Sequence, residues 1–487
     1  MVSASPARGR HPAGPPAAAS PEVPAALAPE GALQIDFLGA ADTVTGSRHL
    51  IGWGGQRVLL DAGLFQGFKV LRERNWLPPG FDPRSLDAVV LSHAHLDHSG
   101  WLPALVRQGF EGPIYASPAT RDLAEVLLLD AAHLQEEDAR RANRMGFSRH
   151  EKALPLFTQA DARKAIARFV TIAPGRSKRI GPLGVSLTPA GHLLGASCVS
   201  LVHQGERLVF SGDLGRRDDL LMPPPQPLTE ADVLLVESTY GNRLHPAEDS
   251  TERLGALVRD TIGRGGSVLL PTFAVGRAQA LLLALQRLKS RGEIPAHLPV
   301  YLDSPMAIEA TELYRRHRQL LRVPQGEMAR LVEHVHLITT GAQSQRLARS
   351  QMSARMPAVI LSASGMATGG RVLHHLKAMA PDPRHAIVFA GFQVGGSRGA
   401  LLVAGARDVK VHGELVPVRA RVEHLQGFSG HADADELMAW LGHFRQAPRQ
   451  TFVVHGEPAA ADALRQRIAH ELGWNVRVPP QGGRFFP

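Results

Sequence analysis

The segment SHAHLDH at residues 92–98 gathers four potential metal ligands directly after a predicted strand. These ligands are His93, His95, Asp97 and His98. Imidazole and carboxylate are groups that zinc and neighbouring divalent metals accept as ligands. In a loop, this spacing can turn two histidines toward one ion, and Asp97 with His98 toward a second. The alternative is a polar loop that binds no metal, in which three histidines and an aspartate would be close together by coincidence. We therefore predict a metal site here.

Two sites need more ligands than one segment supplies, and further candidates lie along the chain. Each is an ionisable residue near a glycine at the carboxyl end of a predicted strand: Asp61 in VLLDAG, His192 in TPAGHLLG, Asp213 in VFSGDLG and His455 in VVHGE. Glycine lets the backbone approach an ion closely. Taken singly, each residue could equally be a structural cap, but their shared position after strands indicates a common site.

The elements that position these residues change in kind along the chain. Up to Tyr240, short strands dominate, interrupted by a predicted long helix over 121–144 whose apolar residues recur at three- and four-residue steps. After Tyr240, strands at 266–273, 299–304, 358–364 and 386–392 alternate with helices. This alternation predicts a parallel α/β sheet. Short strands return from about Lys410.

Composition places broader limits on the protein. The 487 residues have a formal net charge of +9, which favours an anionic partner such as nucleic acid but also fits an arginine-rich soluble enzyme. A single cysteine, Cys198, allows no internal disulfide. We find neither a membrane-spanning apolar run nor a signal peptide, and therefore expect a cytoplasmic protein without a membrane partner. Residues 1–30, rich in Ala and Pro, are predicted to be a disordered extension.

The ligand set resembles that of the binuclear hydrolases with the metallo-β-lactamase fold. Three further motifs are similar to those of the β-CASP nucleases, the branch that includes the cleavage and polyadenylation endonuclease and its prokaryotic homologues. They are VESTYGNR (236–243), GFSGHAD (427–433) and VVHGE (453–457). The segments PTFAVGRAQ (271–279), LDSPMA (302–307) and SASGMATGGRVLHHL (362–376) resemble the cap of this branch. The resemblance runs from about Leu33 to about Val478.

The resemblance implies a role for each matched residue. His93, His95 and His192 would hold one zinc, Asp97, His98 and His455 a second, and Asp213 would bridge the two Zn²⁺ ions. Asp61 would orient ligand loops from behind. The catalytic residues would be Asp97, which orients the nucleophile, His431 as general acid, and Glu237, which hydrogen-bonds His431.

The implied fold is an αββα metallo-β-lactamase sandwich, of class α/β, with an inserted α/β β-CASP cap. We expect the sandwich to comprise residues 31–242 and 410–487, and the cap to comprise residues 243–409. The active site would lie in the cleft between them.

The implied function is a zinc-dependent ribonuclease that cleaves single-stranded RNA with a metal-bridging hydroxide, leaving 5′-phosphate and 3′-hydroxyl ends. Ser362, Ser364 and Gly365 could cradle a phosphate, although a plain strand-to-helix turn explains them as well. Arginines in or beside the cap motifs could line an RNA groove or lie solvated on the surface: Arg243, Arg277, Arg371 and Arg398.

Other functions remain open at this stage. A small-molecule hydrolase of the same superfamily would cleave a chromogenic β-lactam rather than RNA. A non-catalytic RNA-binding scaffold would hold no zinc, and a DNA-processing β-CASP nuclease is the third alternative. The sequence does not separate endonuclease from 5′-exonuclease action, reveal an RNA sequence preference, or decide whether the chain forms a homodimer.

Overall fold

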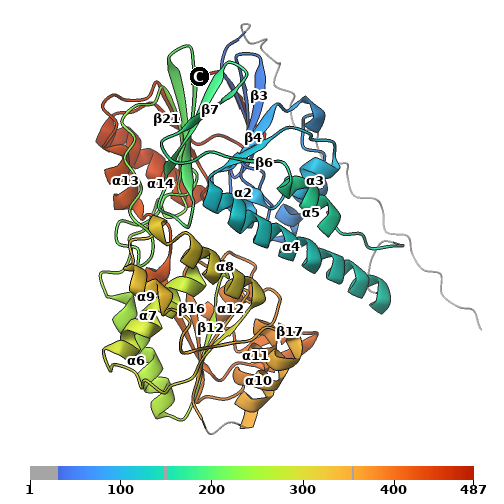
Figure 1. Cartoon of the computed structure of the whole chain (residues 1–487), viewed down its shortest axis with the longest axis vertical. Coiled ribbons are helices and arrows are strands. Elements are labelled where there is room, and N and C mark those ends of the chain that lie inside the picture. Colours follow the sequence, from blue (N-terminus) through green and yellow to red (C-terminus); the bar gives the residue numbers. More distant parts are fainter. Residues whose placement is uncertain (1–30, 147–150, 354–355) are drawn as a thin grey trace, which may run out of the picture.

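The computed structural model describes residues 31–146, 151–353 and 356–487, so the predicted extension at 1–30 lies outside the described residues. Figure 1 shows two bodies along the long axis of the molecule. The upper body contains two seven-stranded sheets, built from both ends of the chain, and the lower body contains a six-stranded sheet. The expected mixed α/β architecture with an inserted cap is confirmed.

The first sheet of the upper body combines antiparallel and parallel pairs. In spatial order it contains β22 (Arg484–Phe485), β1 (Gln34–Gly39), β2 (Arg48–Trp53), β3 (Gln56–Leu60), β4 (Ala88–Val90), β5 (Ile114–Ala116) and β6 (Phe169–Thr171). Strands β2 and β3 form a hairpin whose two turn residues, Gly54 and Gly55, have φ angles of 56° and 76°. Glycine adopts this left-handed backbone at little cost, and the turn matches the twist of the strands.

The second sheet is antiparallel at one edge and parallel at the other. Its order is β21 (Val476–Arg477), β20 (Gln450–Val454), β11 (Val233–Glu237), β10 (Glu206–Phe210), β9 (Ser197–His203), β8 (Leu183–Pro189) and β7 (Ser177–Ile180). Alternate residues of both sheets, such as Val58 and Leu60 on one and Leu208 and Phe210 on the other, form the core between them. The period of two follows from the strand pleat, so the two sheets pack face to face.

Helices cover the outer faces of both sheets (Figure 1). The first sheet is covered by α3 (Leu102–Arg107), α4 (Pro118–Met145) and α5 (Gln159–Ile166), and the second by α13 (Ala434–Leu441) and α14 (Pro458–Arg467). Helix α4 is the predicted long helix. Ser117 caps its first turn by accepting a hydrogen bond from the Thr120 amide, and Gly146 ends it with a φ of 65°. Short helices in this body are α1 (Lys69–Glu73) and α2 (Leu96–Ser99).

The cap sheet is parallel throughout, as the alternating pattern predicts. Its order is β14 (Val335–Leu337), β13 (Val300–Asp303), β15 (Val359–Ser362), β12 (Val268–Pro271), β16 (Ala386–Ala390) and β19 (Arg421–Leu425). The cap helices are α6 (Ser250–Gly263), α7 (Arg277–Ser290), α8 (Pro305–Arg316), α9 (Gln325–Ala329), α10 (Gly341–Ser353), α11 (Val372–Met379) and α12 (Arg398–Val403). A hairpin of β17 (Asp408–Val411) and β18 (Glu414–Pro417) lies before β19.

The cap sheet extends beyond the boundary that we expected at residue 409. Strand β19 pairs in parallel with β16 over five residue pairs, so 421–425 complete the sheet of the cap. The chain then re-enters the sandwich at α13. The sequence pattern did not reveal this because β19, with the sequence RVEHL, is an edge strand of mixed polarity.

A buried carboxylate ties the cap elements together. Asp303 ends β13 and accepts hydrogen bonds from His375 Nε2 of α11 (2.6 Å), Arg371 Nη1 (3.0 Å) and the Ser344 hydroxyl of α10. Burial acts to raise the pKa of Asp303, but the hydrogen bonds from His375, Ser344 and Arg371 outweigh it, and the pKa is lowered. The carboxylate is therefore ionised and joins three segments around the carboxyl edge of the cap sheet.

Among the described residues, no helix combines the length and the apolar character that crossing a membrane requires.

Asp303→Ala tests the importance of this buried cluster. Removing one partner of a buried charged cluster should reduce the free energy of unfolding by about 3–5 kcal/mol, because the Arg371 and His375 donors lose their acceptor. Denaturant unfolding followed by circular dichroism measures the loss. Asp260→Ala is the matched control, since Asp260 forms half-exposed ion pairs with Arg264 and Arg421, and its loss should stay below about 1 kcal/mol. Equal losses in the two variants would contradict the role of Asp303.

Candidate active site

The predicted ligands converge at the edge where both sandwich sheets end. Asp61 follows β3, the 93–98 loop follows β4, His192 follows β8, Asp213 follows β10 and His455 follows β20. Asp61 and His455 have positive φ angles of 58° and 50°. This backbone is uncommon outside glycine and turns the chain sharply directly after the strand. Parallel neighbours end at the same edge, so segments far apart in sequence meet there.

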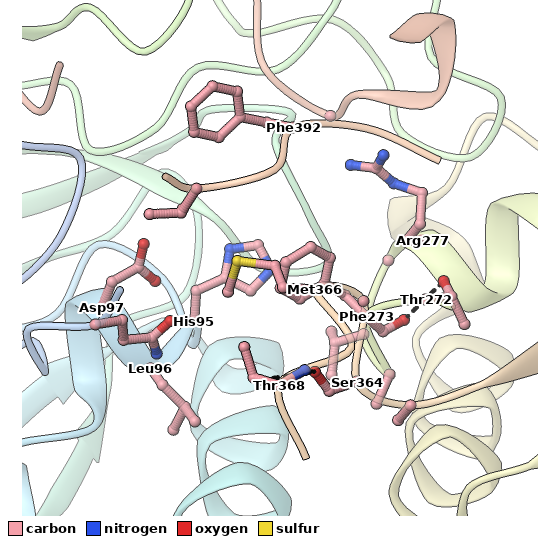
Figure 2. A pocket seen from close by; sticks show the side chains of 18 of the residues that line it. His95, Leu96, Asp97, Thr272, Phe273, Arg277, Ser364, Met366, Thr368 and Phe392 are labelled. Carbon is pink, nitrogen blue, oxygen red and sulfur yellow. Dashed lines mark hydrogen bonds between the residues drawn. The ribbon is translucent and has the colours of Figure 1, made fainter. Parts of the chain in front are cut away.

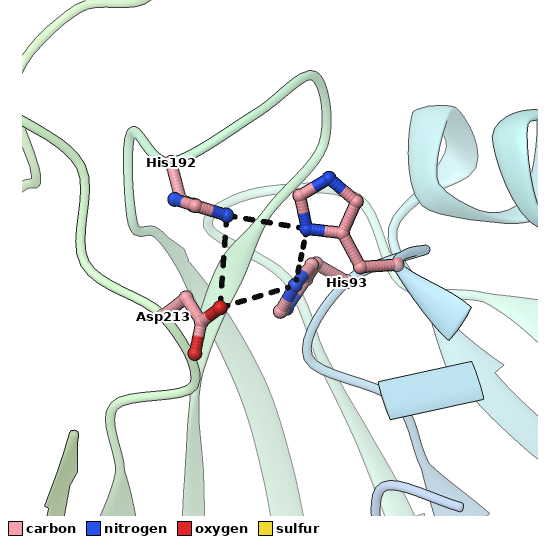
Figure 3. Close-up of side chains that lie close together, drawn as sticks. His93, His192 and Asp213 are labelled. Atoms are coloured by element: carbon pink, nitrogen blue, oxygen red, sulfur yellow. Dashed lines mark hydrogen bonds and ion pairs between the residues drawn. The ribbon is translucent and has the colours of Figure 1, made fainter. Parts of the chain in front are cut away.

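A first group contains His93, His95, His192 and Asp213 (Figure 3). One ligand atom from each lies within 4.8 Å of the others. His95 Nδ1 is 3.2 Å from His93 Nε2 and 3.3 Å from His192 Nε2. Burial lowers the pKa of His95 to about 3 and those of His93 and His192 well below their ordinary value. Neutral imidazole is the form that binds a metal.

A second group contains Asp97, His98 and His455. His98 Nε2 is 3.0 Å from His455 Nε2, and His455 Nε2 is 3.8 Å from Asp97 Oδ2. The ligand atoms of these three residues also lie within 4.8 Å of one another. The two sets of residues that the resemblance implied as ligands are thus also two groups in space.

The Asp213 carboxylate lies between the two groups. Its Oδ2 is 3.5 Å from His93 Nε2 and 3.6 Å from His192 Nε2, whereas its Oδ1 is 3.4 Å from His98 Nε2 and 3.2 Å from His455 Nδ1. Oδ1 is buried and has no hydrogen-bond partner among the described residues. A buried, unpartnered carboxylate oxygen is costly unless a cation compensates it. This donor set therefore fits divalent cations.

Asp61 lies behind the second group. Its Oδ2 is 2.6 Å from His98 Nδ1, and the carboxylate also accepts hydrogen bonds from the Ser92 amide (2.7 Å), the Ser92 hydroxyl (2.9 Å) and the Ser47 hydroxyl (3.1 Å). An acceptor on Nδ1 fixes the tautomer of His98 so that Nε2 faces Asp213 and His455. Asp61 thus orients the His98 ring without belonging to either group.

Glu237 and His431 form a pair beside the two groups. Glu237 Oε1 is 3.3 Å from His431 Nδ1, and the buried carboxylate also accepts the amides of Leu214 (2.7 Å) and Thr239 (3.1 Å). Burial opposes the charged imidazolium, but Glu237 and then Asp213 outweigh it, so the pKa of His431 is raised. His431 is a histidine held ready to carry a proton.

An interdomain cavity of about 760 Å³ opens above these residues. His95, Asp97 and His431 line it from the sandwich, and Phe273, Arg277, Ser364, Met366 and Phe392 line it from the cap (Figure 2). This volume falls in the range of ligand pockets, about 300–1,000 Å³. The cavity lies between sandwich and cap, where the active site is expected from the sequence.

The structure separates the proposed phosphate contacts into two kinds. Ser364, Gly365, Arg277 and Arg398 line the cavity, and Arg277 also donates to the Ala390 carbonyl (2.5 Å). Ser362 and Arg371 do not line it, which corrects their assignment. Ser362 is buried and donates to the Asp303 carbonyl, and Arg371 is bound to Asp303. Arg243 lies over the Tyr240 and Phe392 rings.

Sequence reasoning missed three features of the site. The apolar residues Phe273, Met366 and Phe392 line the cavity, and an exposed lysine, Lys410, lines it from the cap. His245 contacts the backbone of His431. The one signal for His245 in the sequence was its position just after the VESTYGNR motif.

Three family descriptions match consecutive parts of the chain. Residues 49–262 match the metallo-beta-lactamase superfamily, residues 278–402 match the Beta-Casp domain, and residues 415–479 match a Zn-dependent metallo-hydrolase RNA specificity domain.

Characterised relatives cover most of the chain. Ribonuclease TTHA0252 of Thermus thermophilus is 40% identical over 444 residues, which is 90% of this chain and 96% of that protein. The transcription termination factor FttA of Pyrococcus abyssi is 34% identical over 415 residues, 81% of this chain and 61% of that protein. FttA of Methanocaldococcus jannaschii is 32% identical over 459 residues, 89% of this chain and 69% of that protein.

The fold is shared with solved structures, for example the following one. A crystal structure of a protein of unknown function from Enterococcus faecalis V583 has a TM-score of 0.52 at 16% identity, and the match covers 94% of this chain and all of that chain.

Asp61→Ala tests the metal centre independently of activity. Loss of the acceptor on His98 should lower metal affinity about 10- to 100-fold, because His98 is no longer held in one tautomer and orientation. Metal content measured by mass spectrometry during titration with a chelator gives the affinity. Asp36→Ala is the control, since Asp36 is also buried but pairs with Arg484 at the sheet edge. Metal retention equal to wild type in Asp61→Ala would rule out this role.

Proposed function

This chain belongs to the β-CASP branch of the metallo-β-lactamase superfamily and is a metal-dependent hydrolase of the nuclease class; we propose that it is a zinc-dependent ribonuclease acting on single-stranded RNA. The proposal includes two zinc ions per chain, 5′-phosphate and 3′-hydroxyl products, and cleavage within the RNA, from its 5′ end, or both.

The observation that carries the proposal is the His431–Glu237 pair beside the two ligand groups. Hydrolysis of a phosphodiester that leaves a 3′-hydroxyl must expel an alkoxide, which is a poor leaving group without a proton. A thioester hydrolase expels a thiolate, which leaves without a proton, and so has no such need for a carboxylate-paired histidine at the rim of its metal centre. His431 lines the cavity and its Nδ1 lies 3.9 Å from Asp213 Oδ2, so it can reach a group bound at that centre.

The chain would hold the metal through seven side chains. His93, His95 and His192 would bind one ion, Asp97, His98 and His455 the other, and Asp213 both. When bound, such ions lower the pKa of a water, supply a nucleophile at neutral pH and neutralise charge on the phosphate. Asp97 lines the cavity, and its carboxylate would orient the attacking water by accepting a hydrogen bond.

His431 would then donate its proton to the departing 3′-oxygen. Glu237 stabilises the imidazolium through Nδ1, so Nε2 is the nitrogen that delivers the proton to the substrate. Because Glu237 already holds the His431 imidazole in one orientation, the entropy cost of aligning the proton donor does not add to the barrier. After the transfer, water must return a proton to His431, and Glu237 favours that step by raising the pKa of His431.

The preference for RNA rests on the comparisons and on the lining of the cavity. A match to an RNA specificity domain covers 415–479, which includes His431 and His455. Ribonuclease TTHA0252 is similar over nearly its whole length. On the cap side, Arg277, Arg398 and Lys410 supply positive charge for phosphates, and Ser364 supplies a hydroxyl. No observation favours a small-molecule substrate or DNA over RNA.

His431→Ala tests the catalytic acid. The variant should keep its zinc and lose about 10²- to 10⁴-fold in turnover of RNA, the range expected when a general acid is removed. Single-turnover cleavage of end-labelled RNA measures the rate, and metal analysis checks the zinc. His443→Ala, at an exposed histidine in the same C-terminal part, is the control. Cleavage of RNA by His431→Ala at the wild-type rate would remove His431 from the mechanism.

A second experiment tests the substrate and the metal together. Chelation should abolish cleavage of a single-stranded RNA, and added Zn²⁺ should restore it. A perfect duplex of the same sequence should be cut far more slowly, because the scissile strand must enter a cavity enclosed by two bodies of the protein. Product ends mapped on 5′-labelled and internally labelled RNA define the direction of action. Equal rates on duplex and single strand would contradict the single-strand preference.

A further inference from the structure

We propose that His245 is a positioning residue that holds the general acid His431 at the angle required for proton transfer. The inference rests on the proposed function, because it assumes that His431 acts as the acid. It concerns the two crossovers between sandwich and cap. The first leaves β11 at Glu237 and reaches α6 at Ser250, and the second runs from β19 through the turn Gln426–Phe428 to α13.

Hydrogen bonds on both sides of His431 join the two crossovers. His245 Nε2 lies 2.8 Å from the carbonyl oxygen of His431 and donates to it. The His245 amide donates to Asp433 Oδ2 at 2.9 Å, and the Ala434 amide donates to the Arg243 carbonyl at 3.1 Å. The segment that carries the acid is therefore fastened to the outgoing chain at His431 itself and at the two residues that begin α13.

The hydrogen bond to the His431 carbonyl defines the protonation state of His245. A carbonyl oxygen only accepts, so Nε2 of His245 must carry the proton. Nδ1 is buried and without a hydrogen-bond partner among the described residues. An imidazole that donates through one nitrogen and leaves the other bare is neutral, and burial, followed by the charge of Arg216, lowers the pKa of His245 accordingly. His245 is thus a neutral donor to the backbone of the acid and does not itself transfer a proton.

The same crossover also fixes the ring of His431. The Tyr240 ring lies 6.0 Å from the His431 ring at an interplanar angle of 29°, and 5.4 Å from the His245 ring. The His431 ring is also 4.4 Å from the His192 ring. Together with the Glu237 carboxylate on Nδ1, one short segment of chain contacts the backbone, the ring face and the ring nitrogen of His431.

Loss of the His245 donor would leave the carbonyl of His431 without this hydrogen bond in a half-buried loop. The peptide would then rotate to find another donor, and rotation about the backbone moves the ring relative to Asp213. A misplacement of about 1 Å costs roughly 10²-fold in rate. The expected defect is therefore in proton delivery, with metal binding and RNA binding retained.

The test compares substrates that differ in their need for an acid. RNA must expel an alkoxide, whereas bis(p-nitrophenyl) phosphate expels a nitrophenolate, an anion stable enough to leave unprotonated. His245→Phe keeps a ring and removes the donor. It should lower kcat on RNA about 10- to 100-fold, leave KM for RNA and zinc content unchanged, and leave turnover of bis(p-nitrophenyl) phosphate unchanged.

Two further variants keep the result interpretable if His245→Phe folds incompletely. His245→Gln retains an amide donor of similar reach and should restore RNA turnover, and His443→Phe at an exposed histidine should behave as wild type. The ratio of the two turnover numbers in one preparation is independent of the folded fraction. A lowered ratio in His245→Phe that returns in His245→Gln supports the proposal.

Two outcomes would overturn it. An unchanged ratio in His245→Phe would show that His431 needs no support from His245. Equal losses on both substrates would assign His245 to folding or metal binding alone. His431→Ala distinguishes failure of this inference from failure of the proposed function. If His431→Ala lowers the ratio and His245→Phe does not, only the positioning role fails, whereas an unchanged ratio in His431→Ala rejects the acid itself.

Discussion

The buried carboxylate of Asp213 is the group on which the arrangement of the site depends. It lies between four imidazoles supplied by three separate segments, and its Oδ1 has no hydrogen-bond partner among the described residues. Such a carboxylate is stable only when positive charge lies beside it. The ends of β4, β8, β10 and β20 must therefore meet at one edge, and the sandwich accomplishes this by ending both sheets there. The sandwich thus supplies a rigid frame for cations.

Two other carboxylates, Asp61 and Glu237, each bind one histidine of the site, and the two histidines differ in their surroundings. Asp61 accepts from Nδ1 of His98 and so directs Nε2 toward the centre, whereas Glu237 accepts from Nδ1 of His431, which belongs to neither ligand group. In the function that we propose, the same pairing of carboxylate with imidazole would serve a metal ligand in one case and a proton donor in the other. The difference lies in the surroundings: His98 is enclosed within the ligand groups, while His431 faces the cavity shared with the cap.

The predictions from sequence that the structure corrects lie in the cap. Ser362 and Arg371 flank a glycine-rich turn after a strand, a pattern shared by phosphate-binding loops and by plain structural turns. In the structure the turn is a structural one, because both residues bind Asp303. The buried Asp303 carboxylate accepts a hydrogen bond from Arg371, and the backbone carbonyl of Asp303 accepts one from the Ser362 hydroxyl. Asp303 lies 59 residues before Ser362, and no local pattern connects them. The membership of β19 in the cap sheet was missed for a similar reason, since only its parallel pairing with β16 reveals it.

The sequence by itself determined the candidate metal site of this protein. The spacing within 92–98, and the ionisable residues that follow other strands, identified the ligand candidates, whereas the full assignment of ligands to two ions and the role of His431 were implied by the family resemblance. Those features are local, because a motif and the strand before it are set by neighbouring residues. Only the tertiary structure decided which cap side chains reach the cavity, where the cap sheet ends, and that His245 and Tyr240 contact His431. These contacts join segments nearly 200 residues apart, and their formation depends on how the two crossovers pack together rather than on any pattern within either one.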